Sequence, residues 1–368
     1  MILEKKLAEK RLTEAYNNAR IEYFDNNSKY IFFSDCHRGD GTPSDEFAKN
    51  QNIFLFALEF YFNNGYTYVE VGDGDELWEH SNFKHIRLAH DEVYSLLKKF
   101  FDSNKLIMLY GNHNIHLKYN DFVEKNYYKF YDDYNEEDVE LFPGITPYEA
   151  VVFKHKNTGQ EILTVHGHQG DRMNDKLWHF NMFTVRYFWK FLHSIGFINP
   201  ASPVKNSEKI HKIERIYSHW IEMNKIMIIC GHTHRPHFPK VTESPYFNDG
   251  SCVRASGIQG IEIVDGKIML IEWRIRTDPE GDLHIKRKLL RGPEQIETFD
   301  LRNNKTNEKP LRLIFPYGFL IINNILNQSK SYSNAADTSV KHFIISICCG
   351  QCFSHCLHPI HSEAFPFS

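Results

Sequence analysis

The sequence lacks any uninterrupted run of 18 apolar residues, the length that an α-helix needs to cross a bilayer. Its first segment, MILEKKLAEKRLTEAYNNAR, carries charges throughout and has no apolar core of the kind found in a secretory signal peptide. These two absences argue against a membrane-spanning segment and against export. A cytoplasmic location is therefore expected.

An even cysteine framework and an excess of basic charge are also missing. The seven cysteines are odd in number and unevenly spaced, which does not fit a secreted disulfide scaffold. The formal net charge of -4 argues against a nucleic-acid partner, because binding a phosphate backbone normally needs a basic surface. Local basic patches remain compatible with this charge. The 42% of hydrophobic residues can fill the core of one large domain or of two ordinary ones.

Short apolar runs alternate with helical patterns in the first half of the chain. Strands are expected at 29–34, 66–71 and 106–110, each ending at polar residues or glycine. Helices are expected between them, at 45–63 and 89–101. The order strand, helix, strand, helix, strand predicts parallel strands joined by helical crossovers.

The second half favours antiparallel pairing. The segments 149–155 and 161–165 flank Asn157-Thr158-Gly159 and predict a hairpin, and 225–230 is another buried strand. The segments 246–253 and 260–273, the latter with the turn Asp265-Gly266, are expected to be antiparallel strands that complete a second sheet. The fold predicted is α/β, with two packed mixed β-sheets flanked by helices and a helical insertion.

Three parts are expected along the chain. Residues 1–27 form an N-terminal helix, 28–275 the main domain with the insertion at about 171–224, and 276–368 a C-terminal extension of unclear structure. Two helices are expected in the insertion, at 182–197 and 208–223. Its aromatic residues fit an ordinary core better than a lipid pocket.

The tail beyond residue 300 holds a cluster of potential zinc ligands. Its spacing matches no strong zinc pattern, so adventitious cysteines are the preferred reading over a zinc site. The residues concerned are Cys349, Cys352, Cys356, His358 and His361.

Residues of the types that bind metals follow five of the predicted strands. Because ligands of α/β folds bind beyond the carboxyl ends of strands, these residues can converge in one crevice. Carboxylate, imidazole and amide oxygen ligands suit Mn, Fe or Zn. Two ions about 3.5–4 Å apart can activate a water for phosphoryl displacement. The five strand ends are Asp35-Cys36-His37, Gly72-Asp73, Gly111-Asn112-His113, His166-Gly167-His168 and Gly231-His232-Thr233-His234.

The ordered blocks DCH, GDGDE, GNHN, HG and GHTH resemble the calcineurin-like metallophosphoesterase superfamily, over about residues 28–275. The resemblance implies an αββα sandwich and two metal ions. It also implies a catalytic histidine, His113, that contacts the phosphate and protonates the leaving group, and an acid, Glu76, that orients it. For the HGH block it favours His166 over His168. The implied ligands are Asp35, His37 and His234 for one ion, Asn112, His166 and His232 for the other, and Asp73 as the bridge.

One branch of this superfamily is closer than the others. The run from Gly72 to Trp78 is similar to the GDxxExW block of UDP-2,3-diacylglucosamine hydrolases, which share the GHTHRP ending and a helical insertion. That branch generally carries arginine where this chain has His113. The superfamily usually has an acid where Asn114 stands, and its protein phosphatases have arginine where Leu77 stands.

Several further polar residues allow two interpretations. Arg38 could bind substrate phosphate by paired hydrogen bonds or form a plain salt bridge. Asp171 and Asp175 could face the site or lie in a solvated loop. Turns or satisfied surface positions are expected for His80, His85 and His90.

The function predicted is therefore a dinuclear metal-dependent phosphoesterase that hydrolyses a phosphate ester or pyrophosphate bond. Its cofactors are two divalent ions, with Mn²⁺ expected and Fe or Zn also compatible. Its substrate is a small phosphorylated molecule that can be nucleotide- or lipid-linked. The alternatives are a UDP-2,3-diacylglucosamine-type pyrophosphatase, a catalytically silent metal-binding scaffold, and a nuclease, which the net charge disfavours. The sequence does not indicate an oligomeric state.

Overall fold

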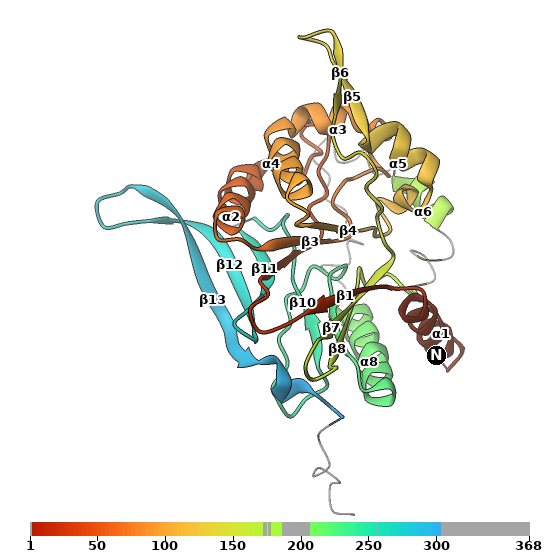
Figure 1. The fold of residues 1–368 in the computed structure, drawn as a ribbon. Helices are drawn as coiled ribbons and strands as arrows, with labels where there is room; N and C mark the ends of the chain where they lie inside the picture. Colours follow the sequence, from red (N-terminus) through yellow and green to blue (C-terminus); the bar gives the residue numbers. More distant parts are fainter. Residues whose placement is uncertain (1, 172–174, 176–177, 186–206, 256, 303–368) are drawn as a thin grey trace, which may run out of the picture. The chain divides into compact units, whose positions relative to one another are not determined.

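Two β-sheets pack face to face in the computed structural model, and helices cover their outer faces (Figure 1). The structure describes residues 2–171, 175, 178–185, 207–255 and 257–302, which belong to one compact unit. The architecture confirms the predicted α/β class, with two mixed sheets flanked by helices.

The larger sheet has six strands. Strands β2, β3 and β4 are parallel to one another, and β11, β12 and β13 continue the sheet beside β2 with antiparallel pairing. The strands in spatial order are β13 (Leu283–Gln295), β12 (Lys267–Thr277), β11 (Ile258–Val264), β2 (Tyr30–Phe33), β3 (Thr67–Val71) and β4 (Leu106–Leu109).

The smaller sheet has five strands, of which only the β7–β8 pair is antiparallel. A separate two-stranded ribbon is formed by β5 (Lys129–Asp132) and β6 (Glu137–Glu140). The five strands in spatial order are β1 (Arg20–Phe24), β7 (Ala150–His155), β8 (Glu161–Val165), β9 (Met227–Cys230) and β10 (Tyr246–Asn248).

Helices complete both outer layers. The described α-helices are α1 (Ile2–Asn17), α2 (Gln51–Asn63), α3 (Phe83–Ala89), α4 (Asp91–Asp102), α5 (Asn120–Tyr127), α6 (Trp178–Thr184) and α8 (Ser207–Asn224). Short 3₁₀ turns occupy Ala48–Asn50, Ile115–Lys118 and Ile296–Phe299.

Strand β2 shows why its sequence, YIFF, is apolar at every position. Successive side chains of a strand point to opposite faces, and here both faces are covered. Phe33 packs against Phe54 of α2 on the helix side, with ring centroids 5.8 Å apart. Phe32 packs against Phe153 of β7 between the sheets, at 5.3 Å. The outer face of the smaller sheet is covered by α1 and α8, through residues such as Leu12 and Trp220.

Most of the predicted elements are confirmed. Helix α2 begins at Gln51 rather than at Asp45, because the Asp45 carboxylate accepts hydrogen bonds from the backbone N–H groups of Phe47 and Ala48 and forms a tight turn there. The hairpin of β7 and β8 and the hairpin of β11 and β12 are both present.

The pairing expected for residues 246–253 is wrong. Strand β10 is only three residues long and pairs in parallel with β9 in the smaller sheet, whereas β11 and β12 extend the larger sheet beside β2. The chain turns out of β10 at Gly250, whose φ of 93° lies in the left-handed region. It then crosses to the other sheet.

The expected boundaries also differ from the observed elements. The N-terminal helix ends at Asn17, and β1 follows within the segment 1–27 as an edge strand paired with β7. Beyond residue 275, β13 pairs with β12 and extends the larger sheet. Helix α8 confirms the second insertion helix. Most of the 182–197 segment and all of 303–368, with its cysteines and histidines, lie outside the described residues.

Among the described helices, none combines the length and the apolar character that crossing a bilayer requires.

Replacing Phe153 by Ala should lower the free energy of unfolding by about 3–5 kcal/mol, because this ring fills the space between the sheets against Tyr30 and Phe32. Urea unfolding followed by circular dichroism would measure the change. The control, Tyr134→Ala, removes a side chain that is 93% exposed and should stay within about 0.5 kcal/mol of the parent. Equal losses in both variants would contradict the packing described here.

Candidate metal centre

The seven predicted metal ligands all lie in loops at the carboxyl ends of strands from both sheets. Asp35 and His37 follow β2, Asp73 follows β3, and Asn112 follows β4. From the smaller sheet, His166 follows β8, and the pair His232 and His234 follows β9. The structure therefore brings residues about 200 positions apart in the chain to one end of the sandwich.

Asp35, His37 and His234 form the first cluster, with ligand atoms close enough to share one ion. His234 Nε2 lies 3.0 Å from Asp35 Oδ1, and His37 Nε2 lies 3.3 Å from His234 Nε2. Two imidazole nitrogens that face each other at this distance and a carboxylate oxygen are a suitable donor set for a borderline divalent cation.

Asp73, His166 and His232 form the second cluster. His166 Nε2 lies 2.9 Å from Asp73 Oδ2 and 3.9 Å from Asp35 Oδ1, so this imidazole connects the two clusters. Its other nitrogen, Nδ1, lies 2.9 Å from the carbonyl oxygen of Val71. A hydrogen bond there uses Nδ1 as the donor, so Nε2 is the nitrogen that would bind an ion.

Asp35 Oδ1, Asn112 Oδ1 and His166 Nε2 are buried at this centre without a well-formed hydrogen bond, although Asp35 Oδ1 has His234 at 3.0 Å and His166 Nε2 has Asp73 at 2.9 Å. Buried polar atoms are normally paired, since leaving one unpaired costs about 1–3 kcal/mol. All three belong to predicted ligands, and all three are atoms through which such residues bind cations. The donor set therefore fits divalent metal ions.

Five residues of the centre have left-handed backbone conformations. Their φ angles lie between 48° and 65°, a strained region for residues other than glycine, and such strain concentrates at functional sites. Backbone hydrogen bonds from Asp35 N to Gly72 O and from His37 N to Asp73 O, at 3.1 and 2.9 Å, lock the first two loops together. The five residues are Asp35, His37, Asp73, His232 and His234.

Two glycines let the loops approach the carboxylates. A Cβ added at Gly111 would lie 2.2 Å from Asp73 Oδ1, and one added at Gly231 would lie 2.1 Å from Ser34 Oγ. No side chain fits at either position. The glycines of the GNHN and GHTH blocks are therefore required by close packing around the ligands.

Burial and neighbouring charges shift the pKa values in opposite directions. Burial by itself raises the pKa of Asp35 and of Asp73, but the imidazoles of His234 and His166 outweigh it and hold both pKa values well below their ordinary range. Burial lowers the pKa of His166, yet Asp73 and Asp35 raise it to about 9. Burial lowers the pKa of His232. The centre thus holds two ionised carboxylates, which attract cations.

His113 lies beside the two clusters in a defined environment. Its Nδ1 lies 2.6 Å from Glu76 Oε2, and the same oxygen lies 2.8 Å from His37 Nδ1. The indole ring of Trp78 stacks on the imidazole, with centroids 4.3 Å apart and planes inclined by 27°. His113 is 23% exposed through its side chain, whereas Glu76 and Trp78 are buried. The ring is held from two sides and keeps one edge open.

The predicted role of Arg38 in substrate binding is wrong. The guanidinium is fully buried, and it donates to Asp75 through Nε at 2.7 Å and to both carboxylate oxygens of Glu70 at 2.7 and 2.9 Å. Tyr94 and Tyr127 also donate hydrogen bonds to Asp75. The side chain has no contact with solvent and so cannot reach a substrate. Its buried ion pairs with Glu70 and Asp75 stabilise the first two loops.

The other histidines with an ambiguous role differ in burial. His80 and His90 are buried and pair with Asp40 and Asp45, at 3.0 and 2.8 Å, so neither has a surface position, although His90 lies in a turn, as expected. His85 is exposed, as expected. His168 is buried beside His166 and His232, and burial lowers its pKa.

The two aspartates after the HGH block have different surroundings. Asp171 Oδ2 lies 3.8 Å from His232 Nε2, at the edge of the second cluster. Asp175 pairs with Arg11 of α1 at 3.1 Å and accepts the N–H of Gly170 at 2.9 Å. Asp171 therefore faces the centre, and Asp175 joins α1 to the loop.

Three residues that support the centre carry no clear signal in the sequence. Asn248 donates to the carbonyl oxygen of Gly231 at 2.6 Å and fixes the GHTH loop. Ser34 donates to Asp35 Oδ2 and lies 2.7 Å from Asp249 Oδ1. Burial, together with the nearby charge of Asp35, raises the pKa of Asp249 well above its ordinary value. The triplet Asn248-Asp249-Gly250 is a turn signal that could have placed this loop.

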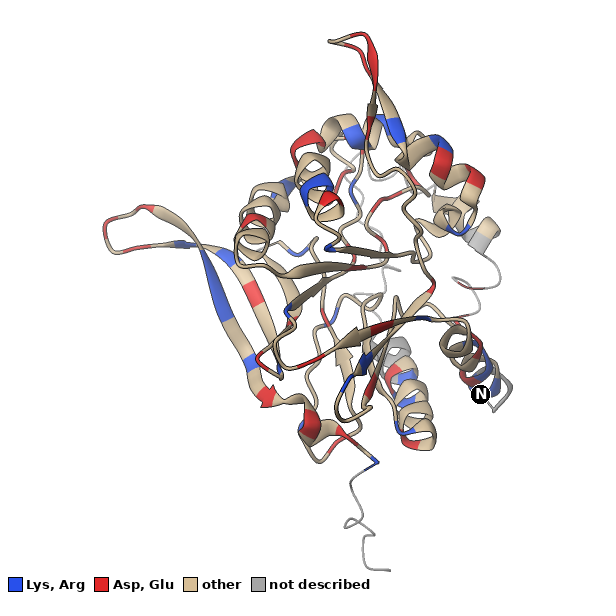
Figure 2. Ribbon diagram, viewed as in Figure 1, with Lys and Arg blue, Asp and Glu red and all other residues tan. Residues whose placement is uncertain are grey.

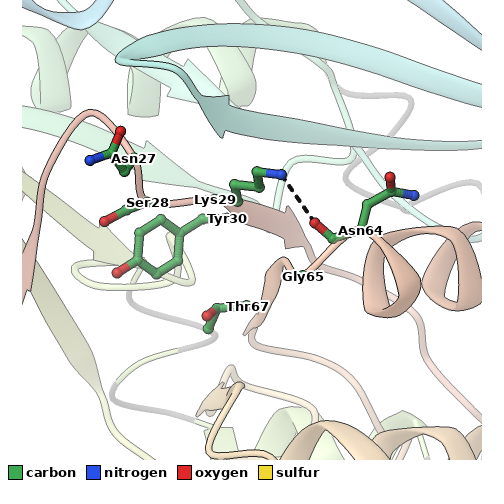
Figure 3. A pocket seen from close by; sticks show the side chains of 7 residues that line it. All are labelled: Asn27, Ser28, Lys29, Tyr30, Asn64, Gly65 and Thr67. Atoms are coloured by element: carbon green, nitrogen blue, oxygen red, sulfur yellow. Dashed lines mark hydrogen bonds between the residues drawn. The ribbon is translucent and has the colours of Figure 1, made fainter.

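A shallow pocket lies at the other end of the larger sheet, at the start of β2 and β3 (Figure 3). Lys29 Nζ donates to the carbonyl oxygen of Asn64 across it, at 3.2 Å. None of the predicted ligands lines this pocket, so it has no part in the metal centre.

Comparisons with known proteins leave the family open. No protein-family model matches the chain, and no curated protein is similar to it in sequence. Among solved structures, the chain is similar to a Staphylococcus aureus protein whose name describes it as a candidate 5′-nucleotidase, with 12% identity and a TM-score of 0.30. The match covers 72% of this chain and 54% of that protein, about half of its length. A TM-score this low establishes no common fold.

Replacing His166 by Ala should lower the Mn²⁺ bound per chain from about two ions to about one, because Nε2 of this residue is a buried ligand atom of the second cluster. Isothermal titration calorimetry would measure the stoichiometry. His168→Ala is the matched control, since it removes the other histidine of the block, and it should bind as many ions as the parent. The reverse pattern would make His168 the ligand.

Replacing Arg38 by Met should destabilise the protein by about 3–5 kcal/mol, because Glu70 and Asp75 would remain buried without their cation. The control Arg235→Met changes a half-exposed arginine and should cost no more than about 0.5 kcal/mol. Both values come from urea unfolding. An unchanged unfolding curve for Arg38→Met with a raised KM would restore the substrate-binding role.

Proposed function

We propose that this protein is a dinuclear metal-dependent phosphoesterase. The observation that carries the proposal is the convergence of two buried, ionised carboxylates with imidazole nitrogens and an amide oxygen at one end of the sandwich. A histidine fixed by a carboxylate and an indole lies directly beside them. These are the groups that hydrolysis of a phosphate ester requires.

The ligand assignment follows the two clusters. Asp35, His37 and His234 would hold one ion, and Asn112, His166 and His232 the other, with Asp73 between them. Ions bound there supply a nucleophilic water and neutralise charge on the transferring phosphoryl group. Mn²⁺ is the expected metal, and Fe or Zn accept the same nitrogen and oxygen donors.

His113 would act as the general acid. Its Nδ1 faces Glu76, so its Nε2 is the nitrogen left to meet a leaving oxygen at the exposed edge of the ring. Burial by itself raises the pKa of Glu76, but the imidazoles of His113 and His37 hold it far below its ordinary value. The ionised Glu76 would hold the ring through Nδ1 and so aim Nε2 at the leaving oxygen, which is the geometry that a general acid needs.

A pyrophosphatase of the UDP-2,3-diacylglucosamine type is the more specific candidate. It rests on the run from Gly72 to Trp78 and on the GHTHRP ending. In this structure Trp78 stacks on His113, so the tryptophan of that run supports the proposed acid. A catalytically silent scaffold is disfavoured because the seven proposed ligands and the proposed acid all come from loops at the same end of the sandwich.

A turnover screen with added Mn²⁺ separates the reactions. It should include an aryl phosphate, an aryl phosphodiester and a nucleotide-diphosphate sugar. Cleavage of the last in preference to the others supports the pyrophosphatase, and cleavage of the first supports a broad monoesterase. Absence of Mn²⁺-dependent turnover with every substrate, in protein that binds the metal, would favour the silent scaffold.

Replacing His113 by Ala should lower kcat by about 10²–10⁴-fold on the best substrate of that screen, because the leaving group loses its proton donor. Metal content, measured by elemental analysis after Mn²⁺ loading, should stay the same. His85→Ala is the matched control, since it removes an exposed histidine away from the centre, and it should keep full activity. Full activity of the His113 variant would exclude the acid role.

A further inference from the structure

The hairpin of β12 and β13 projects from the body of the protein (Figure 1). Topology places it near the metal centre. Both β2 and β12 are antiparallel to β11, so β12 ends at the same end of the sheet as the loop that holds Asp35 and His37. The hairpin therefore extends beyond the edge of the sheet where the proposed metal ligands lie.

The strand register shows which residue of β12 lies beside Asp35, and therefore where the hairpin begins to extend past the candidate metal ligands. Phe32 pairs with Ile261, and Trp273 pairs with Ile258. Because β2 and β11 are antiparallel, moving three residues back along β11, from Ile261 to Ile258, corresponds to moving three residues forward from Phe32, to Asp35. Ile258 is therefore level with Asp35, and so is its partner Trp273. Two strand spacings separate β12 from β2, which amounts to about 10 Å.

The two faces of the hairpin have opposite characters. Met269, Ile271 and Trp273 point toward the helical layer with α2. Ile268 and Leu270 point toward the space between the sheets. Because side chains alternate along a strand, the later even-numbered positions of β12 lie on the side of the sheet that faces the other sheet. Their cross-strand partners on β13 share that side.

This inner side carries a group of cations, which we call the hairpin cation face. It consists of Arg274, Arg276, Lys286 and Lys288, and Figure 2 shows blue segments along the hairpin. Arg274 pairs with Glu272 at 3.1 Å. Within the described part of the chain, the other three have no acidic partner at ion-pair distance, and all three are exposed.

Other charged groups limit the extent of this face. His284 pairs with Asp278 at 2.7 Å near the tip, where Glu280 and Asp282 add further negative charge. Arg287 is on the opposite side of the strand and pairs with Glu262. Arg276 is opposite His284, next to these acidic groups, whereas Lys286 and Lys288 lie closer to the sheet.

Charge complementarity and reach indicate what this face binds. Arg276 lies three residues beyond the level of Asp35, or about 10 Å, in addition to the lateral separation of about 10 Å. The phosphates of a single nucleotide are adjacent to one another, so they cannot occupy the metal centre and this face together. A nucleic-acid strand carries a phosphate on every nucleotide and can span the distance. The exposed lysines and arginines also protect the edge strand β13 from pairing with a second copy, since like charges would meet.

We propose that the hairpin cation face binds the phosphate backbone of a single-stranded oligonucleotide whose terminal or internal phosphate enters the metal centre. The inference rests on the proposed phosphoesterase and gives it a substrate class. The net charge of -4 averages the whole chain, so it does not describe this one face, on which cations occupy alternate positions of two adjacent strands.

The test compares Mn²⁺-loaded parent protein with the double variant Lys286→Gln/Lys288→Gln. The matched control is Lys10→Gln/Lys240→Gln, which removes the same charge from two exposed lysines elsewhere. Fluorescence anisotropy with a labelled DNA strand of about 12 nucleotides is recorded from about 50 to 200 mM salt, where backbone contacts weaken steeply. Each phosphate contact contributes about -0.7 to the slope of log K against log[salt], so the hairpin variant should reduce the magnitude of the slope by about 1.4. The control should keep the slope of the parent.

Two further measurements make the outcome decisive. Turnover of an aryl phosphate should be equal in all three proteins, because this small substrate does not reach the hairpin. If none of the three proteins turned over the aryl phosphate, the proposed phosphoesterase activity would be contradicted. The salt dependence of DNA binding would still test the hairpin cation face. An unchanged slope in the hairpin variant, or no binding of the strand at 50 mM salt, would overturn the inference. Binding of inorganic polyphosphate without binding of DNA would also overturn it.

Discussion

Two carboxylates, Asp35 and Asp73, lie in loops at one end of the sandwich with almost no contact with water and remain ionised. Removing a charge from water costs several kcal/mol unless other groups compensate for it. In this structure the compensation comes from imidazoles and from hydrogen bonds, among them the backbone N–H of His232 to Asp35 and that of His113 to Asp73. The need to neutralise this buried charge explains the chemistry of every loop around it.

The backbone conforms to the same requirement. Ligands from two sheets can converge only if the chain turns sharply after each strand, and the structure achieves this with left-handed residues and with glycines. The strain is tolerated because adjacent loops hold one another through backbone hydrogen bonds. Beneath them, the buried ion pairs of Arg38 with Glu70 and Asp75 fix the positions of the first and second loops. The charges that fix the loops and the charges of the candidate metal ligands are therefore separate groups, although they alternate in the sequence.

The same fold also explains how a protein with net negative charge can present a cationic surface. A strand directs alternate side chains to opposite sides, so a hairpin with mixed composition can have one apolar side and one basic side. Trp273 anchors the apolar side against Phe56 and Phe60 of α2, with ring centroids 5.8 and 5.3 Å apart. This packing decides which way the cations face, namely toward the side of the larger sheet that faces the other sheet.

The α/β class and most of the strands can be predicted from the sequence alone. So can the position of each candidate ligand directly after a strand. These features are local, because apolar runs and their periods reflect burial and each polar block follows its own strand. The pairing of β10 with β9, in a different sheet from β11 and β12, could not be predicted in this way, and neither could the burial of Arg38. Both depend on which distant segments of the chain pack against these residues. Glu70 is 32 residues from Arg38, and Asp249 is 215 residues from Ser34. Such pairs leave no periodic pattern in the chain, so their charges can be matched only after the sheets have packed.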